Sequence, residues 1–298
     1  MEQRPLAVLA IAALLAGCST PAERDPEAPD FSHVHGLGYL PATNQVLVAT
    51  HHGLIVGNQA GSSWTWEYAG SERYDYMGFT QDAVNRTVVY SSGHPDDRRG
   101  YGGVHLGLRR STDAGQTWEQ RSLKGQVDFH SLTSIPGVEG GLLGLHNGRL
   151  MESRDGGLTW TNHTVPLTYI PLDVAVTDHH VYVASADGLI AGHLGNASSW
   201  KRHGDHGDMA TFYAIAAAPD GSVLFGGTGN GRSGQTYLSR DNATTWQPVE
   251  DAVLGKAAVP AVFAFDATDA NHILAATIGG DVLESHDQAA SWTILRRA

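Results

Sequence analysis

The chain has 298 residues, and its 19 Lys and Arg residues against 31 Asp and Glu residues give a formal net charge of −12 with histidine neutral. An acidic chain repels phosphate backbones, and the adjacent Arg98 and Arg99 follow two aspartates, so no nucleic-acid partner is expected. The length suits a single large all-β domain, since barrels and propellers often exceed the usual domain size of about 150 residues.

The N-terminus has the composition of a targeting segment. Arg4 precedes an apolar run, residues 5–15, that is too short to span a bilayer. Small residues follow, and Leu15-Ala16-Gly17-Cys18 resembles the bacterial lipobox, in which the cysteine thiol is diacylated and the peptide is cut before it. We therefore expect residues 1–18 to be a lipoprotein signal peptide, with Cys18 as the lipidated residue.

The next segment, residues 19–31, is rich in proline and charge and is expected to be a flexible tether. The folded domain then covers residues 32–298. A lipid on Cys18 would anchor this domain to a membrane outside the cytoplasm, in the periplasm or on the cell surface, and which membrane stays open. Cys18 is the only cysteine, so an internal disulfide is excluded.

A tryptophan recurs along the domain with a period typical of propellers. Trp64, Trp118, Trp160, Trp200, Trp246 and Trp292 are separated by 54, 42, 40, 46 and 46 residues. Complete copies of one motif end at two of them, Ser111-Thr112-Asp113-Ala114-Gly115-Gln116-Thr117-Trp118 and Ser153-Arg154-Asp155-Gly156-Gly157-Leu158-Thr159-Trp160. The copies ending at Trp246 and Trp292 replace the glycine with alanine, and those ending at Trp64 and Trp200 also lose the aspartate.

This motif resembles the Asp box, or BNR repeat, of the sialidase-like propeller superfamily, where it forms the turn between the third and fourth strands of a blade. Its chemistry is local. The aspartate accepts hydrogen bonds from the turn, glycine permits a positive φ, and the tryptophan fills the space between neighbouring sheets. The resemblance implies an all-β, six-bladed β-propeller of four-stranded antiparallel blades, at residues 32–68, 74–123, 128–165, 169–204, 210–251 and 259–298.

Histidines gather at one face of the expected propeller, where first strands begin and second strands turn into third strands. Aligning the first strands makes His35, Met77 and His130 equivalent positions of three consecutive blades. Aligning the second strands makes His51 and His146 equivalent. Because adjacent strands lie about 4.8 Å apart, His35 should approach His51 and His130 should approach His146.

These four histidines, with Met77 between the pairs, predict a transition-metal site at the mouth of the central channel. Imidazoles with a thioether suit copper best, and an all-imidazole site would also accept zinc. His33, His52 and His94 are additional or alternative ligands, and Asp128 is expected to orient an imidazole. A polar ligand pocket and plain structural histidines stay open as alternatives.

Other histidines and loops carry weaker signals. His179, His180, His272 and His286 are interpreted as isolated side chains that are solvated or bonded to backbone. Residues 202–208 are interpreted as a polar connector, although their donor spacing could hold a cation. Residues 93–103 lengthen the second blade, either as a lid over the mouth or as an exposed insertion.

Two other function classes remain at this stage. The resemblance raises glycoside hydrolysis, but the Arg-Ile-Pro segment of sialidases is absent and the first blade has no arginine. Hydrolysis by two carboxylates stays open, with Asp75, Asp128, Asp173 and Asp187 near the same face. The third class is a propeller that only binds protein, and the expected partner is then a metal-handling or assembly protein.

Overall fold

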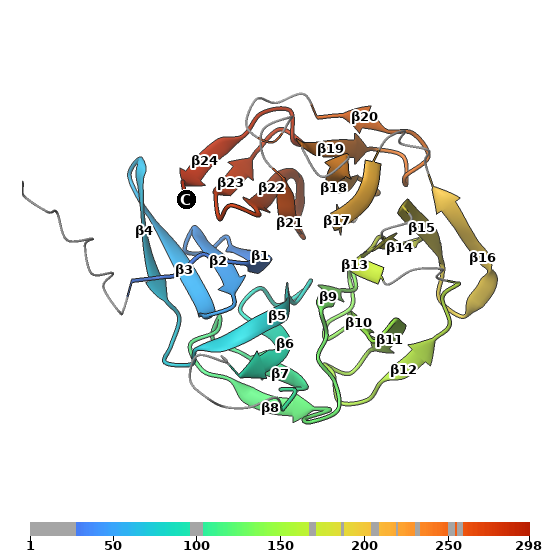
Figure 1. Cartoon of the computed structure of the whole chain (residues 1–298). Helices are drawn as coiled ribbons and strands as arrows, with labels where there is room; N and C mark the ends of the chain where they lie inside the picture. The colour runs from blue at the N-terminus through green and yellow to red at the C-terminus, as the bar shows by residue number, and fades with distance from the viewer. Residues whose placement is uncertain are drawn as a thin grey trace, which may run out of the picture.

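The computed structural model describes residues 28–95, 104–166, 171–185, 188–203, 209–218, 220–229, 233–249, 254 and 259–298. Their strands pair into six four-stranded antiparallel sheets, each built from strands that are consecutive in the chain. Figure 1 shows the sheets arranged around a central axis as the blades of a propeller. The predicted signal peptide, Cys18 and residues 19–27 of the predicted tether lie outside the described residues.

The first three blades hold the residues that the sequence predicts for the site. Blade one contains β1 (Val34–Leu40), β2 (Gln45–Thr50), β3 (Gly53–Ala60) and β4 (Ser63–Tyr68). Blade two contains β5 (Tyr74–Gln81), β6 (Val89–Pro95), β7 (Leu108–Ser111) and β8 (Glu119–Ser122). Blade three contains β9 (Ser131–Ser134), β10 (Leu142–His146), β11 (Arg149–Ser153) and β12 (Thr161–His163).

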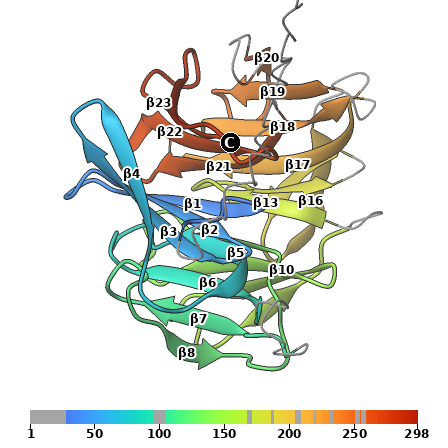
Figure 2. The same cartoon turned by 60° about the vertical axis from the view of Figure 1, so that its left-hand side comes forward.

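The last three blades complete the ring. Blade four contains β13 (Pro171–Val176), β14 (Val181–Ser185), β15 (Gly188–His193) and β16 (Asn196–His203). Blade five contains β17 (Met209–Ala217), β18 (Val223–Gly229), β19 (Ser233–Ser239) and β20 (Gln247–Pro248). Blade six contains β21 (Pro260–Asp266), β22 (Asp269–Thr277), β23 (Val282–Ser285) and β24 (Thr293–Arg296). The first strand of each blade lies nearest the axis (Figures 1 and 2).

Apolar side chains fill the spaces between neighbouring sheets. Leu54 of blade one and Phe79 of blade two share a buried cluster with Trp118, and the Trp118 ring lies 5.1 Å from that of Tyr76. The ring closes in the same way, because Leu274 of blade six packs with Val48 of blade one. Burial of these inner faces provides the main stabilisation of the propeller.

The tryptophan motif forms the same turn in four blades. Asp113, Asp155, Asp241 and Asp287 each accept a hydrogen bond from the serine two residues earlier, at 2.7, 2.8, 2.7 and 2.9 Å. Each also accepts the hydroxyl four residues later at 2.6 Å. Glycine is not essential for this geometry, since Ala243 and Ala289 hold φ values of 62° and 66° in the turns that lack it.

The packed domain begins within the segment that the composition suggested to be a tether. Phe31 is buried, its ring lies 5.3 Å from that of Trp66, and Arg296 lies 3.9 Å above it. Asp30 donates its backbone N–H to the hydroxyl of Tyr68. Phe31 therefore holds the first and last blades together. Within the part of the chain that the structure describes, helices of membrane-spanning length and apolarity are absent.

Candidate metal centre

The inner strands begin in equivalent registers at one mouth of the channel. Gly36 pairs with Ala49, Gly78 with Ser92 and Ser131 with Leu145, and these are the first regular pairs after the strand entrance. The residues directly before them are His35, Met77 and His130, so the register agrees with the sequence alignment. Blades four and six carry apolar Leu172 and Ala261 at this position. Among these five blades, the imidazole and thioether side chains at this position therefore lie on blades one to three.

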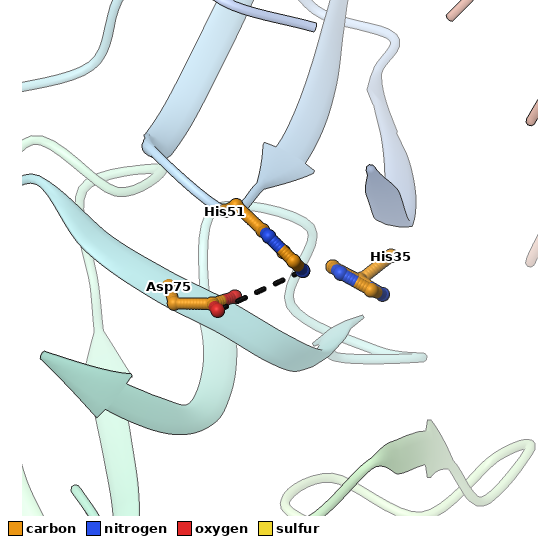
Figure 3. A group of neighbouring side chains, drawn as sticks. All are labelled: His35, His51 and Asp75. Atoms are coloured by element: carbon orange, nitrogen blue, oxygen red, sulfur yellow. Dashed lines mark ion pairs between the residues drawn. The ribbon is translucent and has the colours of Figure 1, made fainter. Parts of the chain in front are cut away.

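Three potential ligands meet at the entrance of blade one. One nitrogen of His35, one of His51 and one oxygen of Asp75 all lie within 4.8 Å of one another (Figure 3). The ring centroids of His35 and His51 are 4.7 Å apart, and His51 Nε2 lies 3.7 Å from Asp75 Oδ2. Two ligands about 2.1 Å from a tetrahedral ion are separated by about 3.4 Å. The ligand atoms are near this separation, and rotation of the stacked rings would direct both nitrogens at one ion.

His35 is held in the form that binds metals. Its side chain is mostly buried, and its Nε2 has no hydrogen-bond partner among the described residues. Burial and the neighbouring imidazoles of His51, His33 and His130 lower the pKa of His35 to about 3. The ring is therefore neutral at physiological pH, with a lone pair ready for a ligand bond.

Asp75 reaches the first blade from the second, and β5 has a bulge between Asp75 and Gly78. It pairs with His94 of β6, and His94 Nε2 lies 3.3 Å from Asp75 Oδ2. His94 Nδ1 lies 3.3 Å from the carbonyl oxygen of Pro95, which accepts its hydrogen bond in one tautomer. A backbone bond of this kind aims the other nitrogen at the Asp75 side of the site.

A second carboxylate, Asp128, lies near histidines of blades two and three. His130 Nε2 lies 3.3 Å and His105 Nδ1 3.9 Å from Asp128 Oδ2. The hydrogen bond to Asp128 raises the pKa of His130. Burial opposes the charge of Asp128, but His130, His94 and His105 together lower the pKa of its carboxyl group. The charges on His130 and Asp128 also act on His35. The group around Asp75 and the group around Asp128 are therefore electrostatically coupled.

The remaining predicted ligands have other positions. The ring of His33 stacks on that of His51, with centroids 4.4 Å apart. The side chain of His52 lies against Asp30, with its Nε2 atom 3.4 Å from Asp30 Oδ2. His146 has both nitrogens engaged, Nδ1 by the backbone of Asp128 at 2.7 Å and Nε2 by the Asn147 amide at 2.9 Å. Met77 is half-buried. The ligand atoms that the structure brings together, on His35, His51 and Asp75, are nitrogen and oxygen.

Asp75 and His105 complete the arrangement, and sequence reasoning gave neither of them a ligand role. Asp75 was visible only as a carboxylate near the correct face. Their signal is the alternation of acid and imidazole over blades one to three, which requires the strand registers to be known. Residues 96–103 of the insertion, Asp187 and His206 lie outside the described residues.

The mouth opens into a cavity of about 220 Å³ along the axis. His35 and His130 line one end of it, and Arg86, Asp266 and His272 line the other. Asp173 faces this cavity and connects three blades, because its carboxylate accepts hydrogen bonds from Ser131 Oγ at 2.6 Å and from the Ile215 N–H at 2.9 Å. Burial raises the pKa of Asp173 to about 6.

Comparisons with known proteins support the architecture. No protein-family model matches the chain, and no curated protein matches it. Among solved structures, an ancestral GH74 enzyme is similar with a TM-score of 0.59 and 17% identity, over 87% of this chain and 37% of that chain. A GH74 xyloglucanase from Xanthomonas campestris gives a TM-score of 0.60 at 16% identity, over 89% of this chain and 55% of that one.

A propeller of similar size is also among the matches. YCF48 bound to D1 peptide has a TM-score of 0.53 and 14% identity, over 90% of this chain and 83% of that chain. This chain thus spans about half or less of the GH74 enzymes but most of YCF48. At these identities the likeness establishes the propeller fold alone.

Proposed function

We propose that this propeller binds a divalent transition metal at its channel mouth, for handling or delivery of the ion outside the cytoplasm. The observation that carries the proposal is the buried, neutral His35, whose Nε2 has no hydrogen-bond partner among the described residues, beside His51 and Asp75. Buried polar atoms are normally hydrogen-bonded, so an unpaired nitrogen next to two further ligands is typical of a binding position. Asp128, His130 and His94 would form the surrounding shell.

Copper(II) fits this ligand set best, and zinc is the second choice. Two imidazoles with one carboxylate suit both ions, and copper(II) binds nitrogen and oxygen ligands more tightly than zinc does. The carboxylate of Asp75 makes the site less suited to copper(I), which prefers sulfur.

The proposal is tested by titrating chelator-treated protein with copper(II) and zinc in the presence of a competing chelator of known affinity. The parent protein should bind an ion, and His35→Ala and His51→Ala should each lower the affinity for that ion by at least about 10-fold. His179→Ala is the matched control, because His179 is an exposed histidine of blade four. Equal affinity in all four proteins would refute the site.

The location of the protein is part of the same proposal. Cleavage before Cys18 and acylation of its thiol would place the metal site on a membrane surface outside the cytoplasm. Mass spectrometry of the mature N-terminus tests this directly. We expect an acylated cysteine as the first residue, and an uncleaved or unacylated chain would contradict the anchor.

Peptide binding is a second candidate function. It is supported by the likeness to YCF48 over most of both chains, since that neighbour is bound to a peptide. A peptide-array screen of the metal-free protein tests it. Peptides that lose binding in His130→Ala, whose side chain is 65% exposed at the mouth, would support the candidate, and the absence of binding peptides would oppose it.

Glycoside hydrolysis has less support from the described carboxylates. Asp75 and Asp128 are paired with imidazoles, and Asp173 is saturated by Ser131 and backbone N–H groups. A two-carboxylate mechanism needs an acid and a base that face a shared substrate space. The described part of this face does not provide such a pair.

A further inference from the structure

A second group of metal-type ligands lies at the other face of the propeller, in blade six. One atom each from His272 on β22, Glu284 on β23 and the adjoining His286 lie within 4.8 Å of one another. We infer that His272, Glu284 and His286 form a separate site for a divalent ion of the zinc type. This inference does not depend on the site at the channel mouth.

The buried member of the group is oriented as metal-binding histidines usually are. His272 Nδ1 lies 3.4 Å from Asp266 Oδ2, and its Nε2 lies 2.8 Å from Glu284 Oε1. A carboxylate on the far nitrogen fixes the tautomer and aims the other nitrogen at the ion. Tyr39 adds a steric restraint, because its ring lies 4.3 Å from that of His272 at 86°.

The second imidazole gives the ion access from solvent. His286 is 67% exposed, and its Nε2 lies 3.3 Å from Glu284 Oε2. The rings of His272 and His286 stack at 4.7 Å with an angle of 12° between their planes, and their Nε2 atoms lie against the two oxygens of Glu284. Two imidazoles and one carboxylate with a fourth, open position match a tetrahedral zinc site.

Blade three shows how this position looks when the ligand set is incomplete. Glu152 occupies the register of Glu284, since each lies directly before the serine of its tryptophan motif. Its partners are Arg154 at 2.6 Å and His163 at 2.8 Å. Arginine cannot bind a metal, so blade three holds an ion pair. Blade six replaces that arginine with His286 and adds a buried histidine.

The experiment is a cobalt(II) titration of chelator-treated full-length protein, followed by visible absorption, which reports tetrahedral coordination. The parent should bind one equivalent of cobalt(II) at this site. His286→Ala and Glu284→Gln should each lower the affinity for this equivalent by at least about 10-fold. His163→Ala should leave this equivalent unchanged and serves as the matched control. A His35→Ala/His51→Ala double variant should also retain it, which separates this site from the one at the channel mouth.

Three results would overturn the inference. The first is a parent protein that binds no cobalt outside the channel mouth, which would make the blade-six group an ion-pair network like that of blade three. The second is an equivalent with the same affinity in His286→Ala and Glu284→Gln. The third is loss of the equivalent in His163→Ala. His286 is exposed, so its variant should keep the parent circular dichroism spectrum, and that check excludes misfolding as the cause of a loss.

Discussion

The imidazoles of His35 and His51 stack face to face, with ring centroids 4.7 Å apart and an angle of 16° between their planes. They come from the first two strands of one blade, at the position where β1 bulges before its regular pairing with β2. Two charged imidazoles would repel each other at this distance. The contact is therefore stable when His35 is neutral, in agreement with its lowered pKa and with a role as a ligand.

Asp75→Asn should weaken metal binding at the mouth by about 10- to 100-fold. The substitution keeps the shape of the side chain but removes the negative charge 3.7 Å from His51. Competitive titration with copper(II) measures the change. Asp178→Asn, at an exposed position of blade four, is the control and should bind like the parent. An unaltered affinity in Asp75→Asn would exclude the carboxylate from the site.

Bound metal should raise the stability of the propeller. An ion present at about 100 times its dissociation constant adds about 2.7 kcal/mol to the free energy of unfolding when it binds only the folded state. Urea unfolding with and without copper(II) measures this gain. The gain should shrink strongly in the His35→Ala/His51→Ala double variant, and a gain of equal size there would show that the ion binds elsewhere.

Ser153→Ala should destabilise the protein by about 1–3 kcal/mol. The buried hydroxyl of Ser153 donates to Asp155 at 2.8 Å and accepts the Gly157 N–H at 2.9 Å, so its loss leaves a buried donor unsatisfied. Urea unfolding measures the difference. Ser198→Ala, in an exposed hairpin, should change stability by less than about 0.5 kcal/mol. Similar values for both variants would argue against a structural role of the motif.

The stability of the parent relative to Asp173→Asn should rise as the pH falls from 7 to 5. The folded pKa of Asp173, about 6, lies above its unfolded value of 3.8, so the folded state binds the proton first. The ionised carboxylate is the less stable form in its buried position. Protonation should then favour the parent by about 1 kcal/mol, while asparagine does not titrate. Parallel urea unfolding at both pH values checks this, and a constant or opposite difference would disprove the raised pKa.

The repeat made much of the architecture predictable. Four of the six tryptophans directly precede a fourth strand, whereas Trp64 and Trp200 lie within β4 and β16. The predicted blade limits lie within a few residues of the observed ones. The contact of His35 with His51 was predictable for the same reason, because alignment of repeated strands places both at one edge. Residues at the same place in a repeat of fixed period occupy equivalent places in successive blades.

The finer pairing of side chains was not predictable. His146 aligns with His51, yet Asn147 and the backbone of Asp128 take up its nitrogens. Asp75 reaches His51 of the neighbouring blade next to a bulge in β5, and no local sequence pattern indicates this contact. His272 and His286 were interpreted as isolated, because only the register of β22 with β23 brings both to Glu284.

The most direct test of the central claim is anomalous diffraction at the copper or zinc absorption edge from crystals grown with that ion. The account predicts a peak about 2.0–2.2 Å from a nitrogen of His35, a nitrogen of His51 and an oxygen of Asp75. A well-ordered channel mouth without such a peak, with these side chains in their present positions, would contradict it.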